Sequence, residues 1–289
     1  MFHSNIISIY GQRGKAWLDE LPELVAAISS KLDLRDLKEV PNLTYNHVLS
    51  GLQGDHPIIL KLGLDHEALA REAFALKCFL GYGAVNVLAE DKGMLLLERA
   101  VPGTSLKSYF PDQEHESIEI ACVVMQKLHQ ASIPKHHNFP HIKYWLTALD
   151  KDCSIPDAYL KKARNLRDQL LQTAKPDVLL HGDLHHDNIL QNGNDWVVID
   201  PKGVIGEPAY EVAAFIRNPI PELLNHVDAT TIIHNRITRF SELFGIPAKR
   251  ILDWCFVQAV LAWVWALEDG CDTSYFEKLT KILDTLSFA

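Results

Sequence analysis

The residues best suited to catalysis lie close together between positions 178 and 202. Asp183 follows an apolar run, Asn188 comes five residues after Asp183, and a second apolar run ends at Asp200. A carboxylate can orient or deprotonate an attacking hydroxyl group, and carboxylate and amide oxygens are ligands that Mg²⁺ prefers. The spacing therefore indicates phosphoryl transfer, with Asp183 as the base and with Asn188 and Asp200 as magnesium ligands.

Transfer of a phosphoryl group from ATP also needs a fixed cation to hold the phosphates that stay behind. Lys61 fits this role because it follows a short apolar segment, 57–60, that has the pattern of a strand. The helix that Asp65 is expected to cap carries two acids, Glu67 and Glu72, and either is a candidate ion-pair partner for the lysine. The alternative is an ordinary surface lysine, which the position after an apolar run disfavours.

Three histidines flank the candidate base and allow other interpretations. His181 is better suited to bracing the loop by hydrogen bonds than to chemistry. His185 and His186, with Asp183 and Asp187 nearby, have the residue types of a transition-metal site. Oxygen ligands fit magnesium better, so we favour magnesium over zinc.

The elements that must position these residues change in type along the chain. Apolar residues at steps of three and four predict a helix over 14–31, which Pro22 is expected to divide into a short turn and a second helix. Helical patterns dominate again after the break at 99–104. Between these regions, short apolar segments separated by turn residues predict antiparallel strands, within 37–62 and at 85–88 and 94–97.

The composition is that of an ordinary globular protein. The 289 residues are 47% hydrophobic and 22% charged, which disfavours a disordered or collagen-like chain and leaves room for about two domains or lobes. The net charge of −9, from 37 acidic and 28 basic residues, disfavours a nucleic-acid partner because phosphates would be repelled. The five cysteines include no CxxC pair, which argues against a disulfide framework or a zinc ribbon.

We expect neither a signal peptide nor a membrane span. The N-terminus lacks the basic-then-apolar pattern of a signal peptide. The most apolar stretch, 254–267, is too short to cross a bilayer and predicts a buried core helix. The expected location is therefore the cytoplasm, with no membrane partner.

Two motifs carry a resemblance to a known family. The sequence HGDLHHDN at 181–188, followed by VVIDP at 197–201, resembles the aminoglycoside phosphotransferase and choline kinase group, which is related to the protein kinases. Three further stretches are similar to the streptomycin 6-phosphotransferase and hydroxyurea-resistance kinase branch: GKAWL at 14–18 with Leu21-Pro22, IDPKGVIGEPAYEVA at 199–213, and RNP at 217–219.

The resemblance implies an α+β, two-lobed protein-kinase-like fold. The N-terminal lobe, residues 1–98, would contain the helical segment 14–31, a small antiparallel β-sheet and one helix. The C-terminal lobe, residues 99–289, would be mainly helical, with ATP bound in the cleft between the lobes.

The resemblance also assigns roles around ATP and Mg²⁺. Asp183 is expected to be the catalytic base, and Lys61 is expected to touch the phosphates and to pair with Glu72 rather than Glu67. No GxGxxG loop is present, so the turn at 42–46 is expected to cover the phosphates instead. The remaining implied residues are Asn188 and Asp200 for magnesium, Asn42, Thr44 and Asn46 in the phosphate turn, and Glu98, Arg99 and Ala100 in a hinge whose backbone binds adenine.

The acceptor would be a small cationic molecule. Glu207 and Glu211 follow the second motif and are candidate substrate contacts. For Glu211 an equal alternative is an ion pair with Arg217 that braces the lobe. Four residues near the end of the apolar helix are also of interest. Glu268 and Asp269 are candidate substrate contacts, and of Trp263 and Trp265, which point to different faces, only one is expected to line a pocket.

The function implied by the resemblance is an ATP-dependent kinase. It would transfer the γ-phosphate to a hydroxyl of an aminoglycoside, such as streptomycin at its 6-hydroxyl, and so confer antibiotic resistance. One alternative is a kinase of the same fold that acts on another small alcohol, such as a sugar, an amino alcohol or a metabolite. A pseudokinase or nucleotide-binding regulator is disfavoured because Lys61, Asp183, Asn188 and Asp200 are all present.

Overall fold

The computed structural model describes residues 2–41 and 43–288, which form two compact units. The first unit extends to Gly103 and also includes residues 191–197, and the second contains residues 104–190 and the chain from Val198 onward. The sequence interpretation had assigned 191–197 to the second part. This segment belongs to the first unit because it contains the turn whose Gly193 N–H donates to Val101 O at 2.7 Å.

The N-terminal helix α1, Phe2–Leu32, runs through Pro22, so the predicted break at that proline was wrong. The chain instead changes direction at Gly11, whose φ of 56° is readily adopted by glycine. Apolar residues on both sides of Pro22, including the buried Leu21, pack against the core, and this packing outweighs the local cost of the proline. A Cβ on Gly14 would lie 2.6 Å from Ile6 O, so the two helical segments approach closely there.

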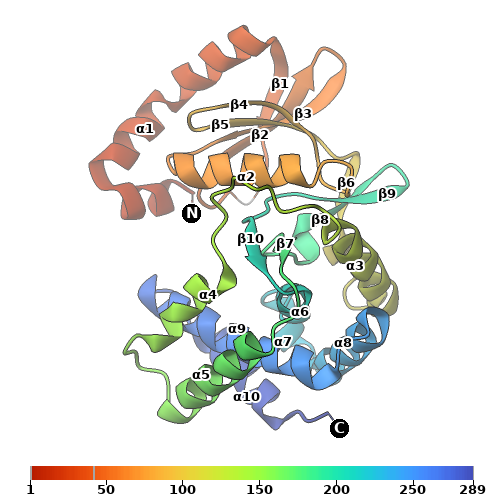
Figure 1. The fold of residues 1–289 in the computed structure, drawn as a ribbon. Helices are drawn as coiled ribbons and strands as arrows, with labels where there is room; N and C mark the ends of the chain where they lie inside the picture. The colour runs from red at the N-terminus through yellow and green to blue at the C-terminus, as the bar shows by residue number, and fades with distance from the viewer. Residues whose placement is uncertain (1, 42, 289) are drawn as a thin grey trace. The chain divides into compact units, whose positions relative to one another are not determined.

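The sheet of the first unit has five antiparallel strands in the order β1-β2-β3-β5-β4 (Figure 1). The predicted antiparallel strands are therefore confirmed. The helix α2, His66–Cys78, begins at Asp65, whose Oδ1 accepts the N–H of Ala68 at 2.9 Å as the sequence predicted. The strands are β1, Leu34–Glu39; β2, His47–Gln53; β3, His56–Leu62; β4, Val87–Asp91; and β5, Met94–Glu98.

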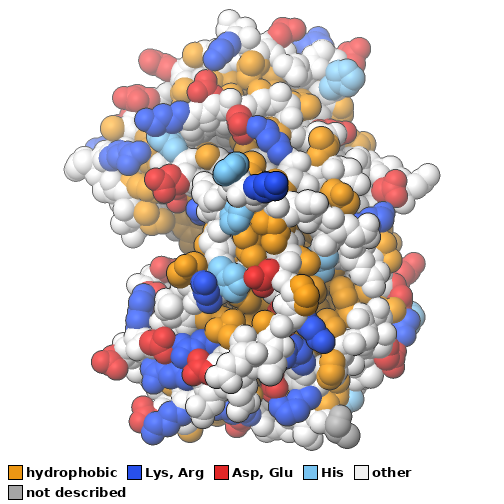
Figure 2. Space-filling model, in the orientation of Figure 1, with side chains coloured by type: hydrophobic (Ala, Val, Ile, Leu, Met, Phe, Trp, Pro, Cys, Tyr) orange, Lys and Arg blue, Asp and Glu red, His pale blue; other side chains and the backbone are white. Residues whose placement is uncertain are grey.

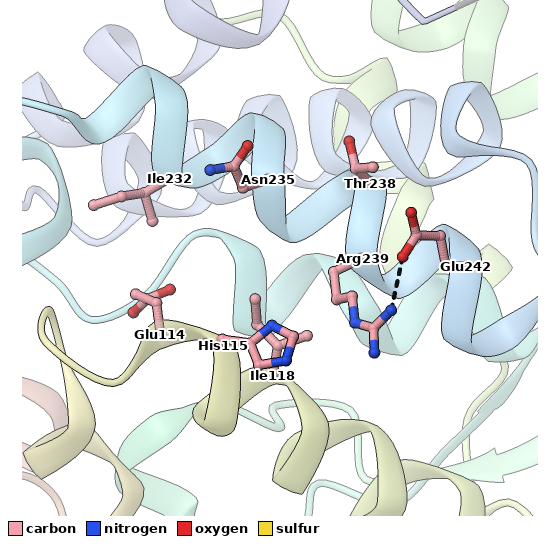
Figure 3. Close-up of a pocket in the computed structure, with 8 residues that line it drawn as sticks. All are labelled: Glu114, His115, Ile118, Ile232, Asn235, Thr238, Arg239 and Glu242. Carbon is pink, nitrogen blue, oxygen red and sulfur yellow. Dashed lines mark hydrogen bonds and ion pairs between the residues drawn. The ribbon is translucent and has the colours of Figure 1, made fainter.

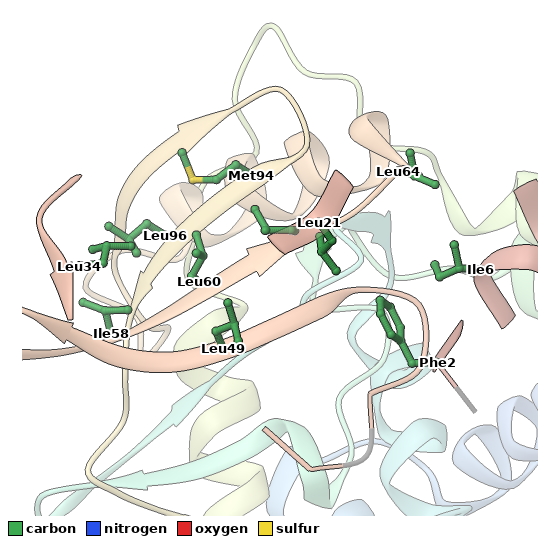
Figure 4. Close-up of a cluster of buried hydrophobic side chains, with 11 residues drawn as sticks. Phe2, Ile6, Leu21, Leu34, Leu49, Ile58, Leu60, Leu64, Met94 and Leu96 are labelled. Carbon is green, nitrogen blue, oxygen red and sulfur yellow. The ribbon is translucent and has the colours of Figure 1, made fainter. Parts of the chain in front are cut away.

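The alternation of side chains along β3 places the core residues on one face of the sheet and Lys61 on the other. Ile58, Leu60 and Leu62 are fully buried in an apolar cluster that also contains Phe2 and Leu21 of α1 (Figure 4). Successive side chains of a strand point to opposite faces of the sheet. Lys61 therefore points away from this cluster, which places its ammonium group on the other face.

The second unit is mainly helical. Its helices are α3, Glu114–Leu128; α4, Ile142–Trp145; α5, Asp157–Gln172; α6, Pro208–Ile216; α7, Glu222–Asn225; α8, Ala229–Phe244; α9, Ala248–Glu268; and α10, Ser274–Thr285. Short 3₁₀ helices lie at Leu106–Tyr109, Leu146–Asp150 and His186–Asn188. Its strands β7, Val178–Leu180, and β10, Val204–Gly206, pair antiparallel. The three-stranded sheet of β6, Pro102–Ser105, β8, Ile189–Asn192, and β9, Asp195–Val198, contains the positions at which the chain passes from one unit to the other.

Helix α9 is the centre of the second unit. It packs against α5, α6, α8 and α10. Among the described residues it is the one helix that is long and apolar enough to cross a membrane, but 78% of its most apolar window is buried inside the protein. The predicted core helix is confirmed.

Candidate active site

The first unit holds a buried lysine–glutamate pair. Lys61 Nζ donates to Glu72 Oε1 at 2.9 Å and to Oε2 at 2.7 Å, and the two residues are only 5% and 7% exposed. Glu67, the competing partner, is exposed on the first turn of α2. The pairing of Lys61 with Glu72 is therefore present in the fold, and it fixes the lysine as a charged group.

The predicted hinge lies at the end of β5, and one of its backbone N–H groups is available to a ligand. The N–H groups of Glu98 and Arg99 donate to backbone carbonyls of the same unit at 2.9 and 3.1 Å. Within the described chain, the N–H of Ala100 has no hydrogen-bond partner although the residue is 5% exposed. Because a buried N–H is costly to leave unpaired, this position suits a ligand acceptor such as an adenine nitrogen.

The predicted phosphate turn lies between β1 and β2. Thr44 is exposed, and its carbonyl accepts the Asn5 side-chain amide at 3.2 Å. Asn46 is half-buried and lies close to the backbone that follows β3, since a Cβ on Gly63 would be 2.1 Å from its Oδ1. Asn42 lies outside the described residues. A role for this turn in phosphate binding stays a prediction.

The loop that carries Asp183 is held by a neutral histidine. His181 is fully buried, and burial lowers its pKa. Its Nε2 lies 2.8 Å from Ile199 O, and its Nδ1 accepts the N–H of Asp183 at 3.3 Å. These contacts require the proton on Nε2 and tie the Asp183 loop to the segment that carries Asp200. His181 is thus placed to brace the loop, as the sequence suggested.

A buried carboxylate closes the other side of the same loop. Glu211 on α6 accepts the N–H of His181 at 2.6 Å and the N–H of Gly182 at 2.9 Å. The side chain is 1% exposed, and these two backbone bonds, in place of the expected ion pair with Arg217, brace the loop. Charge-assisted bonds of this kind are about twice as strong as neutral ones. Sequence alone gave no signal for this role because it depends on which backbone α6 packs against. A substrate contact by Glu211 stays a prediction.

Asp183 is surrounded by positive charge. Arg217 Nη2 lies 3.6 Å from its Oδ1, and Lys202 Nζ lies 3.9 Å from its Oδ2. Burial tends to raise the pKa of this carboxyl, but His185, Lys202 and Arg217 lower it by more, so the pKa of Asp183 is below its ordinary value. The carboxylate is therefore ionised and able to accept a hydrogen bond from a hydroxyl group.

Asn188 and Asp200 suit magnesium by the chemistry of their oxygens. In the described part of the chain, the Asn188 side chain makes its contacts through Nδ2, to Asp183 O at 2.9 Å and to His185 Nε2 at 3.3 Å, which leaves the amide oxygen for a cation. Ile199 N–H donates to Asn188 O at 3.1 Å and so ties Asp200 to the same loop. Asp200 has a φ of 59°, an uncommon conformation for a residue other than glycine. The residues present fit a magnesium ion that also binds phosphates and water.

Glu207 is a second buried carboxylate near the start of α6. It is 1% exposed and binds the guanidinium of Arg250 through both oxygens, with distances from 2.7 to 3.2 Å, and it also accepts the indole N–H of Trp254. A carboxylate buried and satisfied in this way holds α6 to α9. A substrate role for Glu207 stays a prediction.

The last two candidate acids lie at the end of α9. Glu268 and Asp269 are exposed, and Glu268 forms an ion pair with Lys151. On the face drawn in Figure 2, acidic and basic side chains are interspersed, without a broad patch of one sign. Substrate contact by Glu268 and Asp269 stays a prediction.

An aromatic pair lies beside the catalytic loop. A Cβ on Gly182 would be 3.1 Å from the ring of Trp145, and this indole meets that of Trp265 edge to face with centroids 6.1 Å apart. Both tryptophans are half-buried, whereas Trp263 is 5% exposed. Of Trp263 and Trp265, Trp265 is thus the accessible one. Trp145 was missed because α4 is too short to show a helical period.

A cavity lies between α3 and α8 (Figure 3). Its volume is about 430 Å³, and its polar wall includes the ion pair between Arg239 and Glu242. Glu114 in the same wall binds the fully buried Arg236 through two hydrogen bonds of 2.7 Å. None of the predicted catalytic residues lines this cavity.

The comparison with known proteins decides the family. A model described as aminoglycoside/hydroxyurea antibiotic resistance kinase matches residues 44–270, which include Lys61 and the whole catalytic loop. This chain belongs to the aminoglycoside/hydroxyurea antibiotic resistance kinases. The family named by the match agrees with the branch that the sequence resembled, and it makes the chain a phosphotransferase with an alcohol group as acceptor.

The similarity to individual relatives extends over most of this chain. The chain is 31% identical to the streptomycin 3''-kinase of Klebsiella pneumoniae over 231 residues, which are 77% of this chain and 85% of the relative. It is 24% identical to the streptomycin 6-kinase of Streptomyces glaucescens over 275 residues, covering 90% and 88%.

A solved structure confirms the fold of this kinase. The aminoglycoside phosphotransferase APH(4)-Ia, in a complex with ADP and hygromycin B, matches with a TM-score of 0.68 at 14% identity. The match covers 90% of this chain and 96% of that protein. At this identity the likeness shows the protein-kinase-like fold alone, and that fold is the one predicted from the sequence.

Proposed function

We propose that this kinase transfers the γ-phosphate of ATP to a hydroxyl group of streptomycin and thereby confers resistance in the cytoplasm. The observation that supports the proposal is the Asp183 loop, which Glu211 and His181 brace and in which Asn188 Nδ2 donates to Asp183 O at 2.9 Å. In phosphoryl transfer the protein mainly positions the reactants and stabilises charge, and this arrangement supplies the base for the acceptor hydroxyl.

The residues present suit ATP and Mg²⁺. The Lys61–Glu72 pair is proposed to hold the phosphates that are not transferred, and the unpaired N–H of Ala100 to bind adenine. Asn188 and Asp200 would hold the metal. Bound magnesium would neutralise the phosphate charges, while the chain's own Asp183 orients the hydroxyl and accepts its proton.

Streptomycin is the favoured acceptor because two relatives are named for it and because the aromatic pair fits it. Streptomycin carries two guanidinium groups, and a guanidinium is attracted to the face of an indole. Trp145 lies next to Gly182, which precedes Asp183, and its ring contacts that of Trp265, so we propose that this pair contacts the acceptor. Adding a phosphate of nearly two negative charges to this polycation would weaken its attraction to RNA, which is the proposed basis of resistance.

The proposal is tested by following ADP formation with ATP, Mg²⁺ and each member of an acceptor panel. The panel contains streptomycin, hygromycin B, choline, simple sugars and hydroxyurea. We expect streptomycin at millimolar concentration to be turned over at least tenfold faster than the sugars and choline. Nuclear magnetic resonance of the product then assigns the phosphate to the 6-hydroxyl, which we expect, or to the 3''-hydroxyl. Absence of streptomycin-dependent ADP formation would exclude the proposed acceptor.

A second candidate function is phosphorylation of hydroxyurea, because the matching family is named for both compounds. Hydroxyurea is small and uncharged, so its binding would not depend on an aromatic pair. Turnover of hydroxyurea but not streptomycin would favour this second function over the first.

A further inference from the structure

Arg217 is placed to control the catalytic base, a role that its sequence context did not assign. It lies at the C-terminal end of α6, and the Nη2 of its guanidinium is 3.6 Å from Asp183 Oδ1. The sequence singled out the 217–219 stretch as similar to related kinases, and Arg217 as a possible ion-pair partner of Glu211. In the structure its first residue is an ion-pair partner of Asp183.

The guanidinium is held on its other side by the core of the second unit. Arg217 Nη1 donates to Gln258 Oε1 at 2.7 Å, and Gln258, 4% exposed, donates in turn to Tyr210 O at 2.5 Å. The backbone is fixed as well, since the hydroxyl of Tyr275 donates to Arg217 O at 2.6 Å. Contacts with α6, α9 and α10 thus set the direction in which the arginine points.

Arg217 is better suited to this task than the other cation near the base. Lys202 lies 3.9 Å from Asp183 Oδ2, but its side chain is 56% exposed, whereas that of Arg217 is 18% exposed. Solvent screens an exposed charge more strongly, and a lysine loses more side-chain entropy when it is held in one position. Lys202 also has no second partner that would fix it among the described residues.

We propose that Arg217 is a positioning residue that holds Asp183 Oδ1, so that Oδ2 faces the acceptor hydroxyl. During transfer the acceptor oxygen forms its bond to the γ-phosphorus, the bond from that phosphorus to the bridging oxygen of ADP breaks, and the hydroxyl proton passes to Asp183. Arg217 stays protonated throughout. Its effect acts through Asp183 and not through contact with the nucleotide.

The first test compares Arg217→Gln and Arg217→Lys with the wild type. We expect Arg217→Gln to lower kcat about 30-fold or more while the KM for ATP changes less than threefold. Lysine keeps the charge but cannot bind Gln258 and Asp183 in the same fixed fork, so Arg217→Lys should recover part of the rate. Arg164→Gln is the matched control, because Arg164 is half-buried in the same unit, donates to Leu149 O at 2.8 Å and does not contact Asp183. It should leave kcat within twofold.

The decisive test is a double-mutant cycle with Asp183→Asn, measured by transfer of radiolabelled phosphate. If Arg217 acts only through the carboxylate, Arg217→Gln should cost less than threefold in the Asp183→Asn background. An equal loss in both backgrounds would overturn the inference and indicate direct contact with the phosphates or general damage to the fold. An unchanged kcat in Arg217→Gln alone would overturn it as well.

The inference rests on the phosphotransfer of the proposed function but not on the identity of the acceptor. The cycle is measured with whichever member of the panel the wild type phosphorylates fastest. Failure with streptomycin would therefore reject the proposed substrate, whereas additive losses with a working acceptor would reject the role of Arg217. Thermal unfolding of each variant shows whether a loss of rate comes from a loss of folded protein.

Discussion

At the scale of single residues, several buried charges in the described part of the chain have a close partner. Lys61 and Glu72 neutralise one another, Glu207 is bound by Arg250, and the carboxylate of Glu211 accepts two backbone N–H groups. Breaking a buried pair from one side leaves the other charge without compensation, which costs about 3–5 kcal/mol. Such pairs are therefore the positions where a single substitution has the clearest effect.

Substitution of Glu72 is expected to affect both stability and ATP binding. In Glu72→Gln the buried Lys61 loses its counter-charge, so we predict a loss of about 3 kcal/mol in the free energy of unfolding and a KM for ATP raised at least fivefold. Urea denaturation and initial-rate kinetics measure the two effects. Glu67→Gln, at an exposed position of the same helix, serves as the control and should change neither. Equal effects of the two substitutions would refute the pairing.

Substitution of Trp265 is expected to weaken binding of the acceptor without affecting binding of ATP. A cation–π contact is worth about 0.5–2 kcal/mol, so Trp265→Ala should raise the KM for streptomycin roughly two- to thirtyfold while the KM for ATP stays the same. Tyr144→Ala removes a neighbouring aromatic ring that is 63% exposed and should leave both constants unchanged. The proposed acceptor contact fails if Trp265→Ala has no effect on the KM for streptomycin.

At the scale of elements, the helices and strands that carry the site follow local patterns, while their mutual packing does not. The apolar segment 57–60 predicted a strand that ends near Lys61, and Asp65 predicted the start of α2. Pro22 misled the prediction because the packing of α1 against the sheet decides the course of that helix. A proline signals a break only where tertiary contacts do not oppose it.

The close approach at Gly14 gives a prediction about α1. In Gly14→Ala the new Cβ would lie 2.6 Å from the backbone oxygen of Ile6, so the two helical segments must separate. We expect this overpacking to reduce the free energy of unfolding by about 1–3 kcal/mol, although alanine favours helix formation. Urea denaturation measures the change. Lys15→Ala, at the exposed neighbouring position, should be neutral or slightly stabilising. A stabilised Gly14→Ala protein would contradict the described contact.

At the scale of the whole molecule, the sequence predicted the fold and the catalytic motifs but not the surroundings of those motifs. Asp183, Asn188 and Asp200 lie close together in the sequence, so their spacing and their residue types were enough to predict their chemistry. The roles of Glu207, Glu211 and Arg217 arise from contacts between residues about 30 to 43 positions apart. Acidic residues near a predicted site are easily interpreted as substrate contacts. Whether such a carboxylate is available to a substrate depends on its burial and on its nearest partner.

The central claim is that this kinase transfers phosphate with Asp183 as its base. The most direct measurement is transfer of radiolabelled phosphate from ATP to streptomycin by Asp183→Asn and by the wild type, with ATP binding measured in parallel by calorimetry. Loss of a general base costs about 10²–10⁴-fold in rate, so the variant should lose at least a hundredfold in kcat and bind ATP within threefold of the wild type. Transfer at an undiminished rate by Asp183→Asn would contradict the account.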